Sequence, residues 1–198
     1  MQHKKTEEKR YLVVGLGNPG KEFQNTPHNI GRQTIFFLAQ QEAVLLKKSE
    51  KAYGLIGKYA NSDRETFLLL PETFMNKSGL ALKSALSYYK IRPMNLLVVQ
   101  DDSDMELGKI KISFDQNSGG HRGIASIIQS LGSKKFARLK IGIRPVYCPQ
   151  GGKRHTKAEK FIMRKMTAKT QDTITKIAKE AVKSWIVEGT AGTMNKYN

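Results

Sequence analysis

Four polar residues of this chain have types and positions suited to moving a proton and to holding a developing negative charge. They are Asn18, His28, Asn76 and Asp101, and each stands beyond the end of an apolar run that predicts a β-strand. In α/β proteins, ligands bind beyond the carboxyl ends of the strands. We therefore expect these four side chains to meet in one crevice.

His28 is the candidate general base. Thr26 and Pro27 have the residue types of a helix N-cap and of a first helical position, which puts His28 in the first helical turn. The positive end of the helix dipole disfavours the imidazolium form there, so a neutral ring is expected to accept a proton from water. Asp101 is predicted to accept the N–H of the other ring nitrogen and so to fix the tautomer of the base.

The two asparagines supply the complementary chemistry. The carboxamides of Asn18 and Asn76 are expected to position a carbonyl or to donate hydrogen bonds to a developing oxyanion. Each of the four residues taken alone also fits a structural role, because histidine at a helix start and asparagine after a strand are common without catalysis. Only their convergence would favour the catalytic interpretation.

The segment GLGNPG at 15–20 matches the glycine spacing of dinucleotide-binding loops. In such loops the third glycine opens a helix whose backbone N–H groups bind the pyrophosphate. Here residues 21–25 come before the predicted helix, and Pro19 removes one N–H group. Residues 36–40, where a ribose-binding acid would end a strand, have a helical pattern instead. The interpretation of this chain as a nucleotide-dependent oxidoreductase is therefore supported by the glycine spacing alone.

Other chemistries find less support in the sequence. The chain has no G-x-S-x-G elbow for a serine nucleophile and no H-E-x-x-H or C-x-x-C spacing for a metal site. The acidic run at 101–106 has ligand types suited to Mg²⁺, but we interpret it as a solvated turn at the end of a strand. Cys148 lies near His155 in a segment rich in proline and glycine, and we interpret it as a surface thiol.

The chain is strongly basic: 34 Lys and Arg residues against 17 Asp and Glu residues give its 198 residues a net charge of +17. This excess predicts a polyanionic partner, nucleic acid before an anionic membrane; a generally lysine-rich surface is the alternative. With 39% hydrophobic residues the chain can bury one sizeable core, and its single cysteine excludes an internal disulfide. No segment approaches the ~20 apolar residues of a membrane span, so we expect a cytoplasmic protein.

Apolar runs alternate with helical periodicity, which predicts one compact α/β domain over 11–198 behind a charged tail at 1–10. Its central sheet is expected to be mixed, mostly parallel and flanked by helices. Strands are predicted at 11–16, 52–59, 66–70, 95–100, 109–114 and 138–143, and helices at 29–42, 78–89, 122–131 and 170–187. The last helix has the clearest pattern, an apolar stripe of Ile174, Ile177, Ala178, Ala181, Val182 and Trp185.

Two of the predicted strands carry basic residues in alternation. Lys109 and Lys111 share one face of their strand, and Arg138 and Lys140 share one face of another. On neighbouring strands, the two rows would form a surface that binds RNA phosphates. Outward faces that are only solvated are the alternative.

Five blocks of the sequence resemble the bacterial peptidyl-tRNA hydrolase family, in the order in which that family has them. They are VGLGNPG at 14–20 with TPHN at 26–29, PETFMNKSG at 71–79, QDDSD at 100–104, SGGHRG at 118–123 and RLKIGI at 138–143. The resemblance covers about residues 11–145, with a weaker match of GTMN at 192–195. It implies a single compact α/β domain with a mixed sheet, in agreement with the pattern of elements.

The resemblance implies hydrolysis of the ester that joins a peptide to the 3′-terminal ribose of tRNA, with no metal or organic cofactor. The family's general base falls on His28, its aspartate partner on Asp101, and its substrate-binding asparagines on Asn18 and Asn76. The same comparison places four more residues in the substrate site: Phe23, Met75, His121 and Arg122. Peptidyl-tRNA is the implied partner, no membrane partner is expected, and we expect a monomer.

The chain departs from the family pattern at three places. Phe23 stands where an aromatic hydroxyl is common and Arg122 where asparagine is usual, so the hydrogen bonds available from those side chains differ. The segment 146–166 matches poorly and is longer and more basic than is usual. A noncatalytic RNA-binding relative of the same fold is the alternative function, and the presence of both His28 and Asp101 favours the enzyme.

Overall fold

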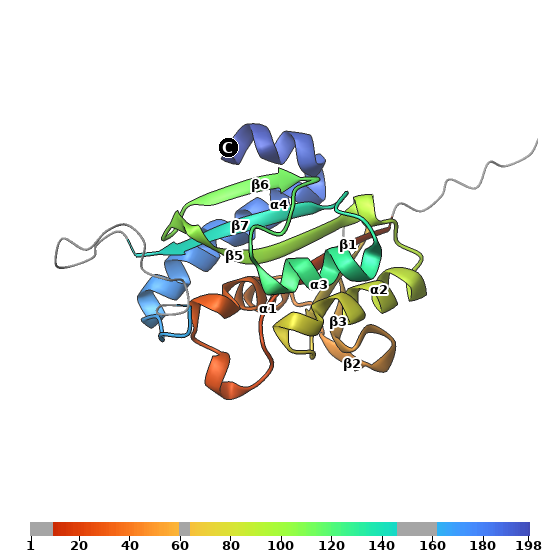
Figure 1. Cartoon of the computed structure of the whole chain (residues 1–198), viewed down its shortest axis with the longest axis horizontal. Coiled ribbons are helices and arrows are strands. Elements are labelled where there is room, and N and C mark those ends of the chain that lie inside the picture. The colour runs from red at the N-terminus through yellow and green to blue at the C-terminus, as the bar shows by residue number, and fades with distance from the viewer. Residues whose placement is uncertain (1–9, 60–63, 146–161) are drawn as a thin grey trace, which may run out of the picture.

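The structure is a computed structural model that describes residues 10–59, 64–145 and 162–198. The predicted charged tail, apart from Arg10, lies outside the described residues, and so do Cys148, His155 and most of the poorly matching basic segment. Figure 1 shows the described elements and their order along the chain.

Seven strands form one mixed sheet in the described part of the chain, in the order β2-β3-β4-β1-β5-β7-β6. Their bounds are β1 Arg10–Gly15, β2 Lys47–Ser49, β3 Gly54–Tyr59, β4 Glu65–Pro71, β5 Leu96–Glu106, β6 Ile110–Phe114 and β7 Ala137–Arg144. The four central strands β4, β1, β5 and β7 are parallel, and antiparallel strands flank them on both sides. The predicted mixed α/β sheet is therefore confirmed.

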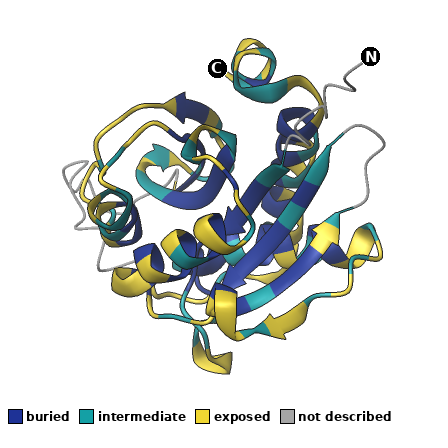
Figure 2. Ribbon diagram, turned by 90° about the vertical axis from the view of Figure 1, so that its right-hand side faces the viewer, coloured by how far each residue is buried: buried dark blue, intermediate teal, exposed yellow. Residues whose placement is uncertain are grey.

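Four α-helices cover the two faces of this sheet in the described residues: α1 Ile30–Gln41, α2 Ser78–Tyr88, α3 Arg122–Leu131 and α4 Ala168–Tyr197. Helices α1 and α4 cover one face of the sheet and form one hydrophobic core with it. Helices α2 and α3 lie side by side on the opposite face and form a second core. Burial is concentrated between these layers, while the outer sides of the helices are exposed (Figure 2). None of the described helices is both long and apolar enough to span a bilayer.

Strands β1 and β4 and the start of β5 carry continuous apolar runs because both of their faces are covered. In β1, Leu12 and Val14 belong to the core under α2 and α3, whereas Val13 belongs to the core under α1 and α4. Alternate side chains therefore enter opposite cores, as a parallel strand buried on both faces requires.

Two of the predicted elements, β5 and α4, differ most from their predictions. Strand β5 continues through the acidic run to Glu106, with a register shift after Asp102, so this run is not a turn at the strand's end. Helix α4 extends to Tyr197, and Gly189, with φ 75°, breaks it into two segments. Ile177 of the predicted apolar stripe is exposed, while the other residues of the stripe are buried.

The outer edge of β6 is covered by the end of α4. The carboxamide of Asn198 accepts a hydrogen bond from the N–H of Ile112 at 2.8 Å and donates one to its carbonyl at 2.9 Å. This side chain thus occupies both polar backbone groups of Ile112 that a neighbouring strand would otherwise bind.

Candidate active site

The candidate site is built at the carboxyl ends of three parallel strands. Strand β1 leads into a loop with two 3₁₀ turns, Lys21–Phe23 and Pro27–Asn29, and β4 leads into the 3₁₀ turn Met75–Lys77. The start of α1 lies tight against β5, because a Cβ at Gly31 would stand 2.2 Å from the carbonyl oxygen of Val99. This close approach brings the turn that carries His28 beside Asp101 on β5.

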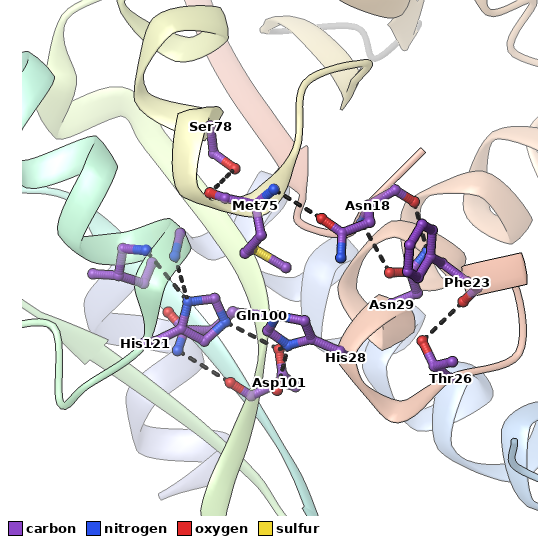
Figure 3. Close-up of polar contacts among 12 residues, drawn as sticks. Asn18, Phe23, Thr26, His28, Asn29, Met75, Ser78, Gln100, Asp101 and His121 are labelled. Carbon is purple, nitrogen blue, oxygen red and sulfur yellow. Dashed lines mark hydrogen bonds and ion pairs between the residues drawn. The ribbon is translucent and has the colours of Figure 1, made fainter. Parts of the chain in front are cut away.

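His28, Asp101 and His121 form a hydrogen-bonded triad (Figure 3). His28 Nδ1 lies 3.0 Å from Asp101 Oδ1 and 3.1 Å from Oδ2, and His121 Nε2 lies 3.0 Å from the same Oδ1. Asp101 is 3% exposed, so its carboxylate depends on these partners rather than on water. The predicted contact between His28 and Asp101 is confirmed.

His121 also fixes the position and tautomer of its own ring. It is the N-cap of α3, where Nδ1 accepts hydrogen bonds from the backbone N–H groups of Gly123 at 3.1 Å and Ile124 at 3.3 Å. A nitrogen that accepts two N–H groups carries no proton, so the ring proton lies on Nε2 and is donated to Asp101. His121 is therefore a partner of Asp101, a role that the sequence did not indicate.

The same logic defines the base. Because Asp101 is an acceptor, His28 Nδ1 is protonated and Nε2 keeps its lone pair for a substrate water. Burial alone would lower the pKa of His28, but the hydrogen bond and the charge of Asp101 outweigh it, so the pKa lies above 6.5. The pKa of His28 is therefore raised, whereas its place near a helix start was expected to disfavour the imidazolium form. Thr26 also differs from its prediction, since its hydroxyl donates to the carbonyl of Phe23 and caps no helical N–H.

Asp101 is held in its charged form. Burial would raise the pKa of its carboxyl, but the N–H donors of His121 and His28, and the charge of either ring when it is protonated, hold that pKa well below its usual range. A permanently charged acceptor between two imidazoles stabilises the imidazolium that forms when His28 takes a proton.

Asn18 is held so that its amide group faces the site. Its Oδ1 accepts the N–H of Met75 at 2.8 Å, which leaves Nδ2 as the donor on the side of His28 (Figure 3). Asn29 binds the Asn18 backbone twice: Oδ1 accepts its N–H, and Nδ2 donates to its carbonyl, both at 2.9 Å. Asn29 is a positioning residue that our sequence analysis missed; its place directly after His28 was the available signal.

The remaining predicted substrate residues surround this centre in different ways. Met75 is buried against the start of α3, since a Cβ at Gly123 would stand 2.6 Å from its Sδ. Phe23 is half-buried in the first 3₁₀ turn of the loop after β1. The side chains of Asn76 and Arg122 are exposed and make no hydrogen bond or ion pair with other described residues. Asn76 follows Met75 and Arg122 follows His121, so both residues lie near the triad, but the structure shows no direct contact between them and His28.

The triad also has the ligand types of a metal site, because its donor atoms all lie within 4.8 Å of one another. A metal at His121 would need the lone pair of Nε2, but the two backbone N–H groups at Nδ1 place the ring proton on Nε2. The residues therefore suit shared protons better than a cation. The acidic run at 101–106 does not offer a set of free carboxylate ligands for a metal either, since Asp102 pairs with Lys140 and Asp104 with Arg144.

The glycine-rich segment does not form a dinucleotide site. Gly20 is followed by two 3₁₀ turns, and α1 begins only at Ile30, so no helix opens at the third glycine. Instead, Gly17 gives room to Arg32, whose Cβ would stand 2.7 Å from a Cβ at that position. Arg32 donates to the carbonyl of Pro71 at 2.5 Å and pairs with Glu72, which ties the loop after β4 to α1.

The two predicted rows of basic residues lie on the neighbouring strands β6 and β7, with Lys111 opposite Lys140, except that Lys109 stands just before β6. Lys109 and Lys111 are exposed, and Lys140 is half-buried with its Nζ 2.9 Å from Asp102. Arg138 differs: it is 1% exposed, and its guanidinium binds the backbone carbonyls of Gln116 and Asn117. The prediction that Arg138 contacts phosphate is therefore wrong, because the loop at 115–121 covers its side chain.

Residues 162–166 from the far end of the basic segment close one side of the site. The N–H of His28 donates to the carbonyl of Ile162 at 3.1 Å, and the N–H of Met166 donates to the carbonyl of Asn25 at 2.8 Å. These two backbone hydrogen bonds hold the loop that carries the base against a segment that lies about 135 residues later in the chain.

Comparisons with known proteins agree with this geometry. A family model described as peptidyl-tRNA hydrolase matches residues 12–198. A peptidyl-tRNA hydrolase of Clostridium tetani is 38% identical over 188 residues, covering 95% of this chain and 97% of that protein. One of Carboxydothermus hydrogenoformans is 36% identical over 192 residues, covering 95% and 98%. The crystal structure of peptidyl-tRNA hydrolase from Acinetobacter baumannii has a TM-score of 0.83 at 30% identity, covering 96% of this chain and 95% of that one. The chain belongs to the peptidyl-tRNA hydrolase family.

Proposed function

We propose that this chain hydrolyses the ester between a peptide and the 3′-terminal ribose of tRNA, with His28 as the general base. The observation that carries the proposal is the pair His28 and Asp101, whose geometry leaves the lone pair of His28 Nε2 available beside the amide of Asn18. Family membership supports the substrate class.

The reaction follows from this arrangement in two steps. His28 Nε2 takes a proton from water while the water oxygen forms a bond to the ester carbonyl carbon, and the carbonyl oxygen becomes an oxyanion. Asn18 Nδ2 donates to that oxyanion. The bond between the carbon and the ribose oxygen then breaks, and His28 returns its proton to the ribose oxygen. The products are a free peptide acid and tRNA with a free ribose hydroxyl.

We assign the exposed and half-buried residues around the triad to the substrate. Asn76, Phe23 and Arg122 are proposed to hold the peptide and the terminal nucleotide, next to buried Met75. Lys109, Lys111 and Lys140 are proposed to contact tRNA phosphates, because Lys111 and Lys140 lie opposite each other on neighbouring strands and Lys109 stands just before β6. The net charge of +17 supports a polyanionic substrate.

The setting of the enzyme is part of the proposal. We propose that residues 11–198 act as one domain behind a charged tail at 1–10, and the family match over 12–198 supports this. We also propose a monomer that works in the cytoplasm, where aborted translation releases its substrate. Gel filtration coupled to light scattering tests the oligomeric state.

The deciding experiment compares wild type and His28→Ala on N-acetyl-aminoacyl-tRNA. The variant should bind tRNA normally and lose hydrolysis by about 10²–10⁴-fold, because it lacks proton transfer and keeps the basic surface. Gln24→Ala, at an exposed position in the same loop, is the matched control and should keep its activity. A wild-type protein that binds tRNA but releases no acyl group would instead indicate a noncatalytic RNA-binding relative.

A further inference from the structure

Arg138 is a charged residue inside the fold. It lies on β7, opposite Ser113 of β6, and is 1% exposed. Nη1 donates to the carbonyl of Asn117 at 2.7 Å, and Nη2 donates to the carbonyl of Gln116. Two adjacent carbonyls suit the fixed fork of a guanidinium. Both belong to the segment 115–121, which we call the bridging loop because it joins β6 to α3.

The bridging loop has little support of its own. Asp115, Gly119 and Gly120 have φ values of 53°, 58° and 81°, and one backbone hydrogen bond, from His121 N–H to the Ser118 carbonyl at 3.1 Å, closes its end. A loop of this kind has no regular ladder to fix it. Among the described residues, Arg138 is the side chain of the sheet that binds its carbonyls.

The end of the bridging loop is part of the catalytic triad. His121 terminates the loop, caps α3 and donates through Nε2 to Asp101. A displacement of the loop therefore moves His121 and removes one of the two N–H donors that hold the Asp101 carboxylate. The position of the base depends on that carboxylate, so the chain of contacts runs from Arg138 to His28.

Stability alone does not account for this arginine. No described carboxylate lies within ion-pair distance of its guanidinium, and its Nε has no hydrogen-bond partner among the described residues. Burial lowers the pKa of Arg138, against the opposing charge of Asp115. Besides the two carbonyls, the guanidinium faces the ring of Phe136, with Cζ 5.1 Å from the ring centroid. A buried cation without a carboxylate partner is costly, and an apolar side chain of similar size is often equally stable at such a place.

We propose that Arg138 is a positioning residue for catalysis. It fixes the bridging loop on the sheet, so that His121 holds the Asp101 carboxylate, and through it His28, in position. Arg138 touches no substrate in this assignment and acts through the loop. The catalytic part rests on the proposed function, whereas the hold on the loop is independent of it.

The experiment uses full-length Arg138→Met, Arg138→Lys and, as matched control, Arg144→Met. Arg144 lies on the same strand but donates to the Ser103 carbonyl and to Asp104, both at 2.9 Å, away from the bridging loop. In Arg138→Met we expect kcat for N-acetyl-aminoacyl-tRNA to fall by about 10–100-fold with KM nearly unchanged, because misplaced catalytic groups cost rate rather than affinity. Amide hydrogens at 115–121 should exchange faster. Arg138→Lys should be intermediate, and Arg144→Met should match wild type.

Two further measurements separate positioning from a general structural role. In Arg138→Ala, added guanidinium at non-denaturing concentration should restore part of kcat by refilling the site between the loop and the sheet. In Arg138→Met, the acid limb of the rate profile should move to higher pH. Asp101 would then no longer share its hydrogen bonds with His121 and would raise the pKa of His28 further, while the charge of Arg122 would still lower that pKa.

Several results would overturn the proposal. A folded Arg138→Met with wild-type kcat removes the positioning role, and so does a loss of kcat without faster exchange at 115–121. If Arg138→Met does not fold, exchange and kcat of Arg138→Lys decide in the same way. Wild type without activity on the ester would refute the proposed function alone, because amide exchange still reports whether Arg138 holds the loop.

Discussion

Replacing Asp101 with asparagine changes the base of this enzyme while almost preserving shape. The carboxylate offers Oδ1 to His28 and His121, both at 3.0 Å, and Oδ2 to His28 at 3.1 Å. An amide whose oxygen takes the Oδ1 position leaves His28 and His121 to share one uncharged acceptor, and its NH2 group takes the Oδ2 position, 3.1 Å from the protonated Nδ1 of His28. Two donors then face each other, which disfavours the tautomer with a free lone pair at Nε2.

The substitution also moves the pKa of His28 in a defined direction. Burial lowers that pKa, and the hydrogen bond and charge of Asp101 raise it by more, to a value above 6.5. Asparagine removes the charge and weakens the hydrogen bond, while burial and the charge of Arg122 still act. The pKa of His28 should therefore fall below 6.5 in Asp101→Asn.

The assay is the pH dependence of kcat/KM on N-acetyl-aminoacyl-tRNA. Wild type should lose activity as the pH falls through a midpoint above 6.5. In Asp101→Asn the plateau should be lower by about 10²–10⁴-fold, the range of lost acid–base assistance, and the midpoint should lie at lower pH. An unchanged midpoint would show that His28 is not the group that titrates, and a loss below about threefold would show that Asp101 does not govern the base.

Three shorter predictions follow from the same geometry. Asn18→Asp should lower kcat by at least about 10²-fold with little change in tRNA affinity, because a negative charge replaces the oxyanion donor; equal losses in binding of deacylated tRNA would contradict it. Lys111→Ala should reduce the slope of log affinity against log salt by about 0.7–0.9, measured by filter binding, whereas an unchanged slope would remove Lys111 from the RNA surface. Arg122→Gln should move the acid limb of the rate profile to higher pH, since Arg122 lowers the pKa of His28; a shift to lower pH would refute this.

The central fold was accessible from the sequence because its signals are local and strong. Continuous apolar runs predicted β1 and β4, apolar residues alternating with Arg138 and Lys140 predicted β7, and the bounds of α3 agree with the prediction. β2 was missed, since only three residues pair with β3 and all three are polar or charged. β5 was predicted too short because its acidic end has a low strand propensity, which the pairing with β7 overrides.

The site was predicted in its residues but not in its connections. His28, Asp101 and Asn18 meet as expected, because strand ends in a parallel sheet share an edge. The pairing of His121 with Asp101 joins residues 20 positions apart through a loop with three positive φ values, and no sequence pattern fixes such a loop. The burial of Arg138 could not be predicted either, because alternation along a strand shows which side chains share a face but not which segment covers that face.

The two hydrogen bonds between Asn198 and Ile112 give the molecule a mechanical link between its last described residue and the bridging loop. Ile112 lies at the centre of β6, and β6 runs directly into the bridging loop. A load applied at residue 198, such as a surface tether, would reach β6 through these two bonds. Tethering through residue 198 would therefore strain the register of β6, on which the place of His121 depends, whereas a tether at the far edge of the sheet, on β2, would leave it relaxed.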